Sequence, residues 1–491
     1  MKNPRNDQTV VLIQPHCSLG LRGEPVLRSE FDSIGLLALG SYLRAQGYRA
    51  ETFHFARAFA IGSSPAELLG RIAELDPLLF GISINWLHLS EGALETAAWL
   101  RQRFPGRPVI VGGQHATFFA ADIMTGHADL FDGVVVGEGE ETLLEVADRV
   151  REGADLAGIA GLMTARDSEL SFAPRRVTLE LDSLPFISYE HFFPLPKPGG
   201  PDRVLAALDT TRGGCRKDCN YCLESRTLGT FGRERSCHYS IDRLVEQIEF
   251  YVRQGRDWVT VQDQFFTHGD AAMLELIERL NKANVHLKHL SFFLEPGSYC
   301  FETYDRLQDA PADELVLSFG IETGSPKVAR NLKRFHDYGR IREELAHIAT
   351  KPYVNSSWWM LGLPEEGPED VELTRKLIVD SMRLGVHARW VTPLILFPQT
   401  ELARDAERFK IRPLLRTFDD FRRFSTTPRN EYATYPELIT HESDCQSAQD
   451  TLRYVVELKK VIEQTQPELE SANRGKFEFT TFARYRKASF F

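Results

Sequence analysis

The stretch that decides the fold of this 491-residue chain is Gly213-Gly-Cys-Arg-Lys-Asp-Cys-Asn-Tyr-Cys-Leu223, which places Cys215, Cys219 and Cys222 in a C-x3-C-x2-C run. Three thiolates at this spacing can hold three irons of one [4Fe–4S] cube and leave the fourth iron without a protein ligand. A structural zinc site usually requires four protein ligands in paired C-x2-C units. Buried core cysteines need no such spacing, and the intervening residues here are polar. We therefore expect an iron–sulfur cluster with one open iron.

The cysteine run resembles the signature of radical S-adenosylmethionine (SAM) enzymes, including the aromatic Tyr221 before the third cysteine. In that family the open iron binds the amino and carboxylate groups of SAM. The resemblance implies that Cys215, Cys219 and Cys222 are the metal ligands and the catalytic centre, with Tyr221 beside the cofactor. Reductive cleavage of SAM then yields a 5'-deoxyadenosyl radical, and the electron comes from an external donor such as a flavodoxin or a ferredoxin.

Composition sets wide limits on function. Hydrophobic residues make up 43% and charged residues 26% of the chain, as in globular proteins, and its length predicts two or three domains. The net charge of −11 argues against a nucleic-acid partner, which requires a basic surface. We expect a cytoplasmic protein without a membrane span, because there is no signal-peptide core and no run of about eighteen apolar residues. The four cysteines outside the run show no pairing pattern, so we expect them to be reduced thiols.

Periodicity divides the chain into four segments. Residues 1–150 alternate short apolar runs with amphipathic helical stretches, which indicates an α/β domain of Rossmann-like (flavodoxin-like) type. Residues 151–203, where prolines accumulate, are expected to be a linker on the surface. Residues 204–410 repeat the βα pattern six times, and the family resemblance adds the shape of a partial (β/α)6 TIM-type barrel. Residues 411–491 predict a small, mostly helical C-terminal region with one amphipathic helix over 447–463.

The first segment carries a second resemblance. Ser83-Ile-Asn85 and Gly112-Gly113 follow successive predicted strands, as the S-x-L and G-G motifs do in cobalamin-binding domains, although Asn85 replaces the usual Leu. In that family the glycines let the backbone approach the buried nucleotide tail of the cofactor. His16 aligns with the lower axial histidine of some members. However, Gln14 replaces the aspartate that orients the imidazole, so we expect His16 to be a polar loop residue.

The segment also resembles the cobalamin domains that are fused to radical SAM barrels, in Val111-Gly-Gly-Gln-His-Ala-Thr117 and Val136-Gly-Glu-Gly-Glu-Glu-Thr142. Such domains commonly lack the axial histidine and place a loop residue beneath cobalt. We expect Trp86 in that role, with Asn85 and His88 as alternatives, while a Trp86 that caps the core is the opposing interpretation. A flavodoxin-like sheet that binds a different nucleotide is also left open.

Three more residues of these motifs are expected to contact cobalamin: His115, Gly137 and Glu138. His115 could instead close its loop as a helix cap. Glu138 could cap a helix N-terminus, where a carboxylate interacts favourably with the helix dipole.

Further candidate cofactor contacts stand where successive strands of the βα repeat end: Asp263, Glu295, Glu322, Gly362 and Pro398. The resemblance implies Asp263 near the methionine ammonium of SAM, and Glu322 on the ribose hydroxyls or the ammonium. It also implies that Gly362 leaves room for adenine. Pro398 belongs to Leu396-Phe-Pro-Gln-Thr400, which is similar to an F-P-G-T stretch of the family.

Together these resemblances imply a cobalamin-dependent radical SAM enzyme, most often a methyltransferase acting on an unactivated carbon of a small molecule or peptide of natural-product type. Cyclisation or rearrangement with the same cofactors stays open, as does a radical SAM enzyme without cobalamin. A non-catalytic cobalamin or iron–sulfur sensor is disfavoured because a sensor needs no open iron. A tRNA methylthiotransferase is disfavoured because that chemistry requires a second cysteine cluster, which the sequence lacks.

Overall fold

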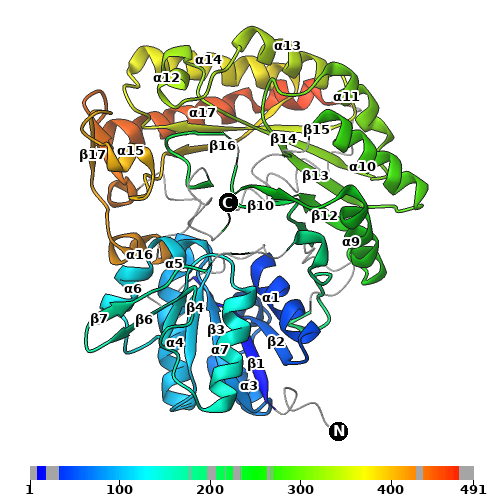
Figure 1. Cartoon of the computed structure of the whole chain (residues 1–491). Coiled ribbons are helices and arrows are strands. Elements are labelled where there is room, and N and C mark those ends of the chain that lie inside the picture. The colour runs from blue at the N-terminus through cyan, green and yellow to red at the C-terminus, as the bar shows by residue number, and fades with distance from the viewer. Residues whose placement is uncertain are drawn as a thin grey trace. The chain divides into compact units, whose positions relative to one another are not determined.

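The computed structural model describes residues 8–17, 33–175, 177, 180–195, 206–215, 217–224, 233, 235–261, 266, 269–426 and 435–474. The chain forms two compact units, and each is described by itself. The first comprises Met1–Leu205, Thr227–Arg235 and Thr417–Pro428. The second comprises Ala206–Arg226, Ser236–Arg416 and Arg429–Phe491. Each unit is a largely parallel sheet with helices packed on it (Figure 1).

The first unit is built on an eight-stranded sheet of order β7-β6-β5-β4-β3-β1-β2-β8. Its five central strands are parallel, and their order is that of a flavodoxin-like fold, which confirms the α/β prediction. All residues of β1 and β3 are buried, as expected for parallel strands covered on both faces. The central strands are β1 (Thr9–Gln14), β2 (Arg49–His54), β3 (Pro77–Ser83), β4 (Val109–Gly112) and β5 (Gly133–Val135).

Helices α1 (Ile34–Ala45) and α7 (Glu140–Glu152) pack on this sheet through a buried cluster that includes Leu43, Leu79 and Val146 (Figure 1). Helix α4 (Ser90–Arg103) approaches the chain after β1 so closely that the Gly92 N–H donates to the Cys17 carbonyl at 2.9 Å. The shorter helices of this unit are α2 (Phe55–Ala60), α3 (Pro65–Ala73), α5 (Gln114–Phe118), α6 (Ala120–Gly126) and α16 (Phe418–Thr426).

The predicted linker, residues 151–203, contributes three strands to the first sheet, so its assignment as a surface linker is wrong there. β6 (Leu162–Arg166) pairs antiparallel with β5 and with β7 (Glu169–Ser171), and β8 (Phe192–Phe193) pairs parallel with β2. Leu162 and Phe192 are buried. These strands are only two to five residues long, which is too short to show a periodicity in the sequence.

The predicted C-terminal region, residues 411–491, is divided between the two units. Helix α16 belongs to the first unit, where Phe418 and Phe421 pack against His115 and Phe119 with ring centroids 5.4–6.3 Å apart. The Arg422 Nε–H also donates to Glu91 Oε2 of α4 at 2.8 Å. The burial of aromatic rings holds α16 in the first unit. The sequence around α16 contains no pattern from which these distant packing partners could be predicted.

The second unit is built on six parallel strands in sequence order, β9-β12-β13-β14-β15-β16. Among the strands described, β9 and β16 each pair with one neighbour, so the sheet is an open arc with helices outside it (Figure 1). This confirms the partial (β/α)6 barrel predicted for residues 204–410. The strands are β9 (Ala206–Leu208), β12 (Trp258–Val261), β13 (His289–Leu294), β14 (Leu315–Glu322), β15 (Val354–Leu361) and β16 (His387–Pro393).

Several helices of this unit begin at a Ser, Thr or Asp whose side chain accepts a backbone N–H of the first turn. They are α9 (Ile241–Arg253), α12 (Pro326–Asn331), α13 (Tyr338–Ile348) and α15 (Glu401–Arg404). The others are α10 (Asp270–Lys282), α11 (Phe301–Arg306) and α14 (Pro368–Leu384). Two short antiparallel pairs complete the unit: β10 (Thr211–Arg212) with β11 (Cys237–His238), and β17 (Ile411–Pro413) with β18 (His441–Ser443).

The long C-terminal helix α17 (Ala448–Ala472) begins where the sequence predicts, after a capping box of Ser447 and Asp450. It continues past the predicted end at residue 463 and through Pro467. Val455 and Leu458 are buried, and the Asn473 side chain donates to the Gly385 carbonyl at 2.9 Å. None of the described helices has the length and apolarity needed to cross a membrane.

The close approach at Gly92 generates a test with a matched control. A Cβ on Gly92 would lie 1.8 Å from the His16 carbonyl oxygen, whereas a Cβ on Gly70 of α3 would meet nothing within 4 Å. We expect Gly92→Ala to destabilise the protein by about 1–3 kcal/mol because the backbone must shift. Gly70→Ala should instead stabilise it by up to about 1 kcal/mol. Urea unfolding followed by circular dichroism measures both, and equal effects of the two variants would contradict the packing described.

Candidate functional site

The cysteine run lies in the second unit, on the loop that follows β10. Gly213 and Gly214 begin it with φ values of +88° and +89°, which glycine adopts without strain. The Lys217 backbone N–H donates to Cys215 Sγ at 3.2 Å. Burial raises the pKa of Cys215 to about 11 and that of Cys222 to about 12. The thiolate forms of this loop therefore need a compensating positive charge.

The donor set of this loop is three cysteine thiols, and cysteine thiolates are the usual ligands of iron–sulfur clusters. A [4Fe–4S] cube binds each thiolate to a different iron, so its ligands surround it without converging on one point. Its cationic core would also offset the buried negative charge of the three thiolates.

A buried network joins the cysteine loop to the ends of two strands. Arg334 Nη1 donates to the Tyr221 hydroxyl at 3.3 Å, and Nη2 donates to Glu295 Oε2 at 3.0 Å. Glu322, the last residue of β14, lies 4.0 Å from Arg334 and also bonds the Tyr221 hydroxyl. The structure therefore brings Tyr221, Glu295 and Glu322 together around Arg334, and their contact with SAM stays a prediction.

Glu322 has two unusual properties for a strand-end carboxylate. Its φ of +68° is uncommon for a residue with a side chain, and such conformations concentrate at functional sites. Burial raises its pKa, an effect that the charge of Arg334 opposes. Sequence reasoning missed Arg334, because this residue follows α12 in a turn that carries no recognisable motif.

Gly362 directly follows the last residue of β15 and is closely packed against the C-terminal region. Its φ is +76°, and a Cβ there would meet Thr451 of α17 at 3.0 Å. Its N–H donates to Glu366 Oε2 at 2.8 Å, and its carbonyl is 2.6 Å from His441 Nε2. The space beside Gly362 is thus filled by the C-terminal region on that side, where adenine was expected. A role for Gly362 in cofactor binding stays a prediction.

The stretch around Pro398 forms the turn that begins α15, where the Thr400 side chain caps the helix. The Leu402 N–H donates to the Asn220 carbonyl at 3.1 Å, which ties α15 to the cysteine loop. Pro398 therefore stands on a turn that leads to this loop, and its contact with SAM stays a prediction. Asp263 lies outside the described residues.

In the first unit, Asn85 links two loops at the carboxyl ends of the strands. Its Nδ2 donates to Ser33 Oγ at 3.1 Å, and its Oδ1 accepts the Gln114 N–H at 3.2 Å. Ser33 Oγ lies 3.4 Å from the hydroxyl of Ser83. A Cβ on Gly113 would lie 2.6 Å from Asn85 Oδ1, so the pair requires glycine there. Asn85, which stands where the family usually has Leu, therefore has a structural role: its side chain connects these two loops.

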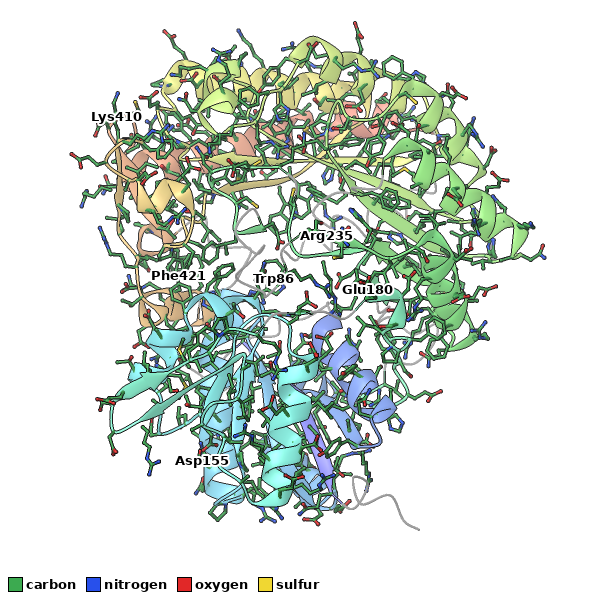
Figure 2. All side chains as sticks on the ribbon, viewed as in Figure 1. Trp86, Asp155, Glu180, Arg235, Lys410 and Phe421 are labelled. Carbon is green, nitrogen blue, oxygen red and sulfur yellow. The ribbon has the colours of Figure 1, made fainter. Side chains whose placement is uncertain are left out.

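Trp86 is 55% exposed at this edge of the sheet (Figure 2), so the interpretation that it caps the core is wrong. His88, one of its alternatives, is buried in the short helix η2 (Leu87–Leu89). Gly112 ends β4, and Gly137 has a φ of +91° and donates its N–H to Thr117 Oγ1 at 3.1 Å. The loops at this edge of the sheet thus present the large aromatic ring of Trp86, which a ligand can contact.

His115 and Glu138 have other surroundings than expected. His115 is 3% exposed within the aromatic cluster of Phe119, Phe418 and Phe421, and burial lowers its pKa to about 3. It does not cap α5, because Gly113 is the N-cap. The N-cap position of α7 is occupied by Gly139, the residue after Glu138. Contact of either residue with cobalamin stays a prediction.

Two side-chain pairs of this unit were not foreseen from the sequence. The Glu138 carboxylate forms a two-pronged ion pair with Arg233, with Nη2 donating to Oε2 at 2.8 Å and both side chains at most 10% exposed. His16 is fully buried, with Nε2 2.6 Å from Glu95 Oε2 and its ring stacked on Trp99. The expectation of a polar loop histidine is therefore wrong, because the ring is part of the packing between α4 and the chain after β1.

Two family models match the chain. Residues 26–147 match the B12 binding domain, and residues 211–378 match the radical SAM superfamily. The protein belongs to the radical SAM proteins that carry a B12-binding domain.

Two similar solved structures come from this class. One is the radical S-adenosylmethionine methyltransferase TsrM from Kitasatospora setae with cobalamin and a [4Fe–4S] cluster bound; it has a TM-score of 0.66 and 16% identity over 93% of this chain and 89% of that chain. The other is the cobalamin-dependent S-adenosylmethionine radical enzyme OxsB with aqua-cobalamin and S-adenosylmethionine bound. Its TM-score is 0.59 at 15% identity, over 82% of this chain and 56% of that chain. At these identities the likeness shows the fold.

Curated relatives match over parts of their length. An uncharacterized methyltransferase of Pyrococcus horikoshii is 23% identical over 305 residues, which cover 60% of this chain and 62% of the relative. The anaerobic magnesium-protoporphyrin IX monomethyl ester cyclase of Synechocystis sp. is 26% identical over 290 residues, 57% and 54% of the two chains. The chain thus spans less than two thirds of each of these relatives.

Glu366, which holds the Gly362 turn, predicts a pH dependence of stability. Burial raises its pKa to about 8. Neutral Glu366 therefore contributes stability that is fully present below about pH 4.5, the value for an ordinary Glu, and is lost as the pH rises through about 8. In the native protein, Glu366 lowers the free energy of unfolding by up to about 1.4 kcal/mol for each pH unit over this range. Glu366→Gln imitates the neutral form and should abolish this dependence on pH. Urea unfolding at pH 5.5, 6.5 and 7.5 measures the difference.

Glu365→Gln is the matched control. The neighbouring Glu365 is exposed and pairs with Lys410 at 3.0 Å, and its hydrogen bond to Lys410 lowers its pKa. This variant should keep the pH slope of the native protein over that range. An unchanged slope in Glu366→Gln would contradict the assignment of a proton to Glu366.

Proposed function

We propose that this protein is a cobalamin-dependent radical SAM methyltransferase that acts on an unactivated carbon of a small molecule or peptide. The observation that carries the proposal is the cysteine loop, where the Cys219 thiol lies beside the buried Arg334, which also contacts Tyr221 and Glu322. The B12-binding domain in the same chain supports methyl transfer as the outcome of the radical chemistry. An external flavodoxin or ferredoxin as electron donor, the absence of a nucleic-acid partner and a cytoplasmic location belong to the same proposal.

Cys215, Cys219 and Cys222 would hold three irons of the cluster, which when bound supplies SAM with one electron through its open iron. Glu322 would accept hydrogen bonds from the ribose hydroxyls or the ammonium of SAM, since an ionised carboxylate accepts at both oxygens. Tyr221 and Arg334 hold that carboxylate in place.

In the first unit, Gly112 and Gly113 would let the backbone approach the nucleotide tail of cobalamin, and Ser83 and Asn85 would hold the loops around it. Cobalamin, when bound, supplies the carrier that passes a methyl group from one SAM to the substrate. The exposed Trp86 would cover the lower face of the corrin and keep water from cobalt. In support, TsrM and OxsB were each solved with a cobalamin bound.

The substrate is proposed to be small and to contain a planar group. Phe293 of β13, Trp358 of β15 and Trp390 of β16 are half-buried, and the Trp358 ring centroid lies 5.2 Å from that of Phe293 and 5.7 Å from that of Trp390. Aromatic side chains on one face of a sheet suit a planar ligand. TsrM has also been solved with tryptophan as substrate and a SAM analogue bound, which agrees with this size.

Radical cyclisation is the second candidate, favoured by the likeness to the Synechocystis cyclase. Mass spectrometry separates the two, because methylation adds one CH₂ to the product and cyclisation by hydrogen loss adds none.

Cys219→Ala tests the cluster. After anaerobic reconstitution with iron, sulfide and hydroxocobalamin, we expect about four irons and one corrinoid per native chain. The variant should lose the iron and reduce 5'-deoxyadenosine formation from SAM to background while it keeps the corrinoid. Cys300→Ala, at an exposed cysteine, should behave like the native protein. Undiminished SAM cleavage in Cys219→Ala would falsify the cluster assignment.

Trp86→Ala tests the corrin contact. Loss of a large aromatic surface should weaken hydroxocobalamin binding by at least about tenfold. Ile61→Ala removes another exposed apolar side chain of the same unit, 61% exposed, and should leave binding unchanged. Equilibrium dialysis measures both affinities. Native affinity in Trp86→Ala would show that this residue does not contact the cofactor.

A further inference from the structure

The guanidinium of Arg334 is the most highly coordinated charged group beside the cysteine loop. Its side chain is 8% exposed. Nε donates to His336 Nε2 at 3.2 Å, and Nη2 donates to Glu295 Oε2 at 3.0 Å and to the Gly320 carbonyl at 2.5 Å. Nη1 donates to the Tyr221 hydroxyl at 3.3 Å and to Cys219 Sγ at 4.0 Å. These are five acceptors for the five N–H groups of an arginine.

The turn that carries Arg334 contacts the cysteine loop at several points. The Asn220 side chain donates to the Asn331 carbonyl at 2.7 Å, and Lys333 Nζ donates to Asp218 at 2.9 Å. The backbone N–H of Arg334 bonds the Ala329 carbonyl of α12 at 2.8 Å, which holds the turn against the helix. The guanidinium is thus positioned from one side by α12 and from the other by the ends of β13 and β14.

A fixed cation at this place has a defined effect on a cluster. Three thiolates bring three negative charges to a [4Fe–4S] core, and reduction adds one electron without making or breaking a bond. A nearby cation stabilises the more negative, reduced form, and hydrogen bonds to the sulfurs act in the same direction. The effect is large for a buried cation, because solvent does not screen it.

We infer that Arg334 is a positioning residue that raises the reduction potential of the cluster through its N–H···S contact with Cys219 and its buried charge. This inference rests on the proposed function, because it requires the cluster. Arginine is needed at this position since an ammonium has three donors and cannot serve five acceptors. Arg334 thereby makes the cluster reducible by the external electron donor.

The test is a redox titration of the reconstituted full-length protein, without SAM, followed by electron paramagnetic resonance of the reduced cluster. We expect Arg334→Gln to lower the ratio of reduced to oxidised cluster at least tenfold at the native midpoint. That change corresponds to about 59 mV for one electron. Arg330→Gln is the control, because it removes an exposed arginine from α12, the helix that precedes Arg334, and should shift the midpoint much less.

The outcomes separate the two proposals. Native protein without about four irons per chain would overturn the proposed function itself. A native cluster whose midpoint is unchanged in Arg334→Gln overturns the inference about Arg334 and leaves the function intact. If Arg334→Gln does not take up iron, the same redox titration of Arg334→Lys is used instead. A lower midpoint in that variant supports the inference, because the N–H···S contact is lost while the positive charge is kept, and the native midpoint overturns the role assigned to that contact.

Discussion

The second unit depends on one constraint: the cysteine loop must carry negatively charged thiolates although it is partly buried. Burial raises the pKa of Cys215 and of Cys222, so the thiolates are costly unless positive charge stands beside them. Arg334 supplies positive charge beside the remaining cysteine of the run, Cys219, and five hydrogen bonds hold its guanidinium in place. Glu295 and Glu322 are at once the anchors of this cation and the candidate ligands of SAM.

The C-terminal region completes both units by packing, although only one of its elements looks regular in the sequence. Thr451 of α17 fills the space beside Gly362, and His441 approaches the Gly362 carbonyl. In the first unit, Phe418 and Phe421 of α16 surround His115, which burial keeps neutral. The turn beside a candidate cofactor contact is therefore held by residues from the far end of the chain.

Sequence reasoning succeeded for the fold class, because the periodicity of each βα unit is contained in one short segment. Cys219, Tyr221 and the strand-end Glu322 lie around the same arginine, Arg334, and their roles at a cofactor stay predictions. Sequence reasoning failed for His16, whose partner Glu95 lies on another element, and it did not foresee the ion pair of Glu138 with Arg233, which follows the cysteine loop. In a sequence, a carboxylate at a predicted helix start suggests a helix cap. The neighbouring residues do not reveal that this carboxylate forms an ion pair with a distant arginine.

What the sequence by itself determined is the set of local patterns: the C-x3-C-x2-C run, the two series of βα units and the glycines that end their strands. These follow from covalent spacing and from periodicities of a few residues, which a single segment specifies. Only the tertiary structure decided which groups meet across the chain: Arg334 with Cys219, Asn85 with Gly113, and Thr451 with Gly362. Such pairs arise because buried charges and close-packed backbones need complementary neighbours, and complementarity in space leaves no periodic trace in the sequence.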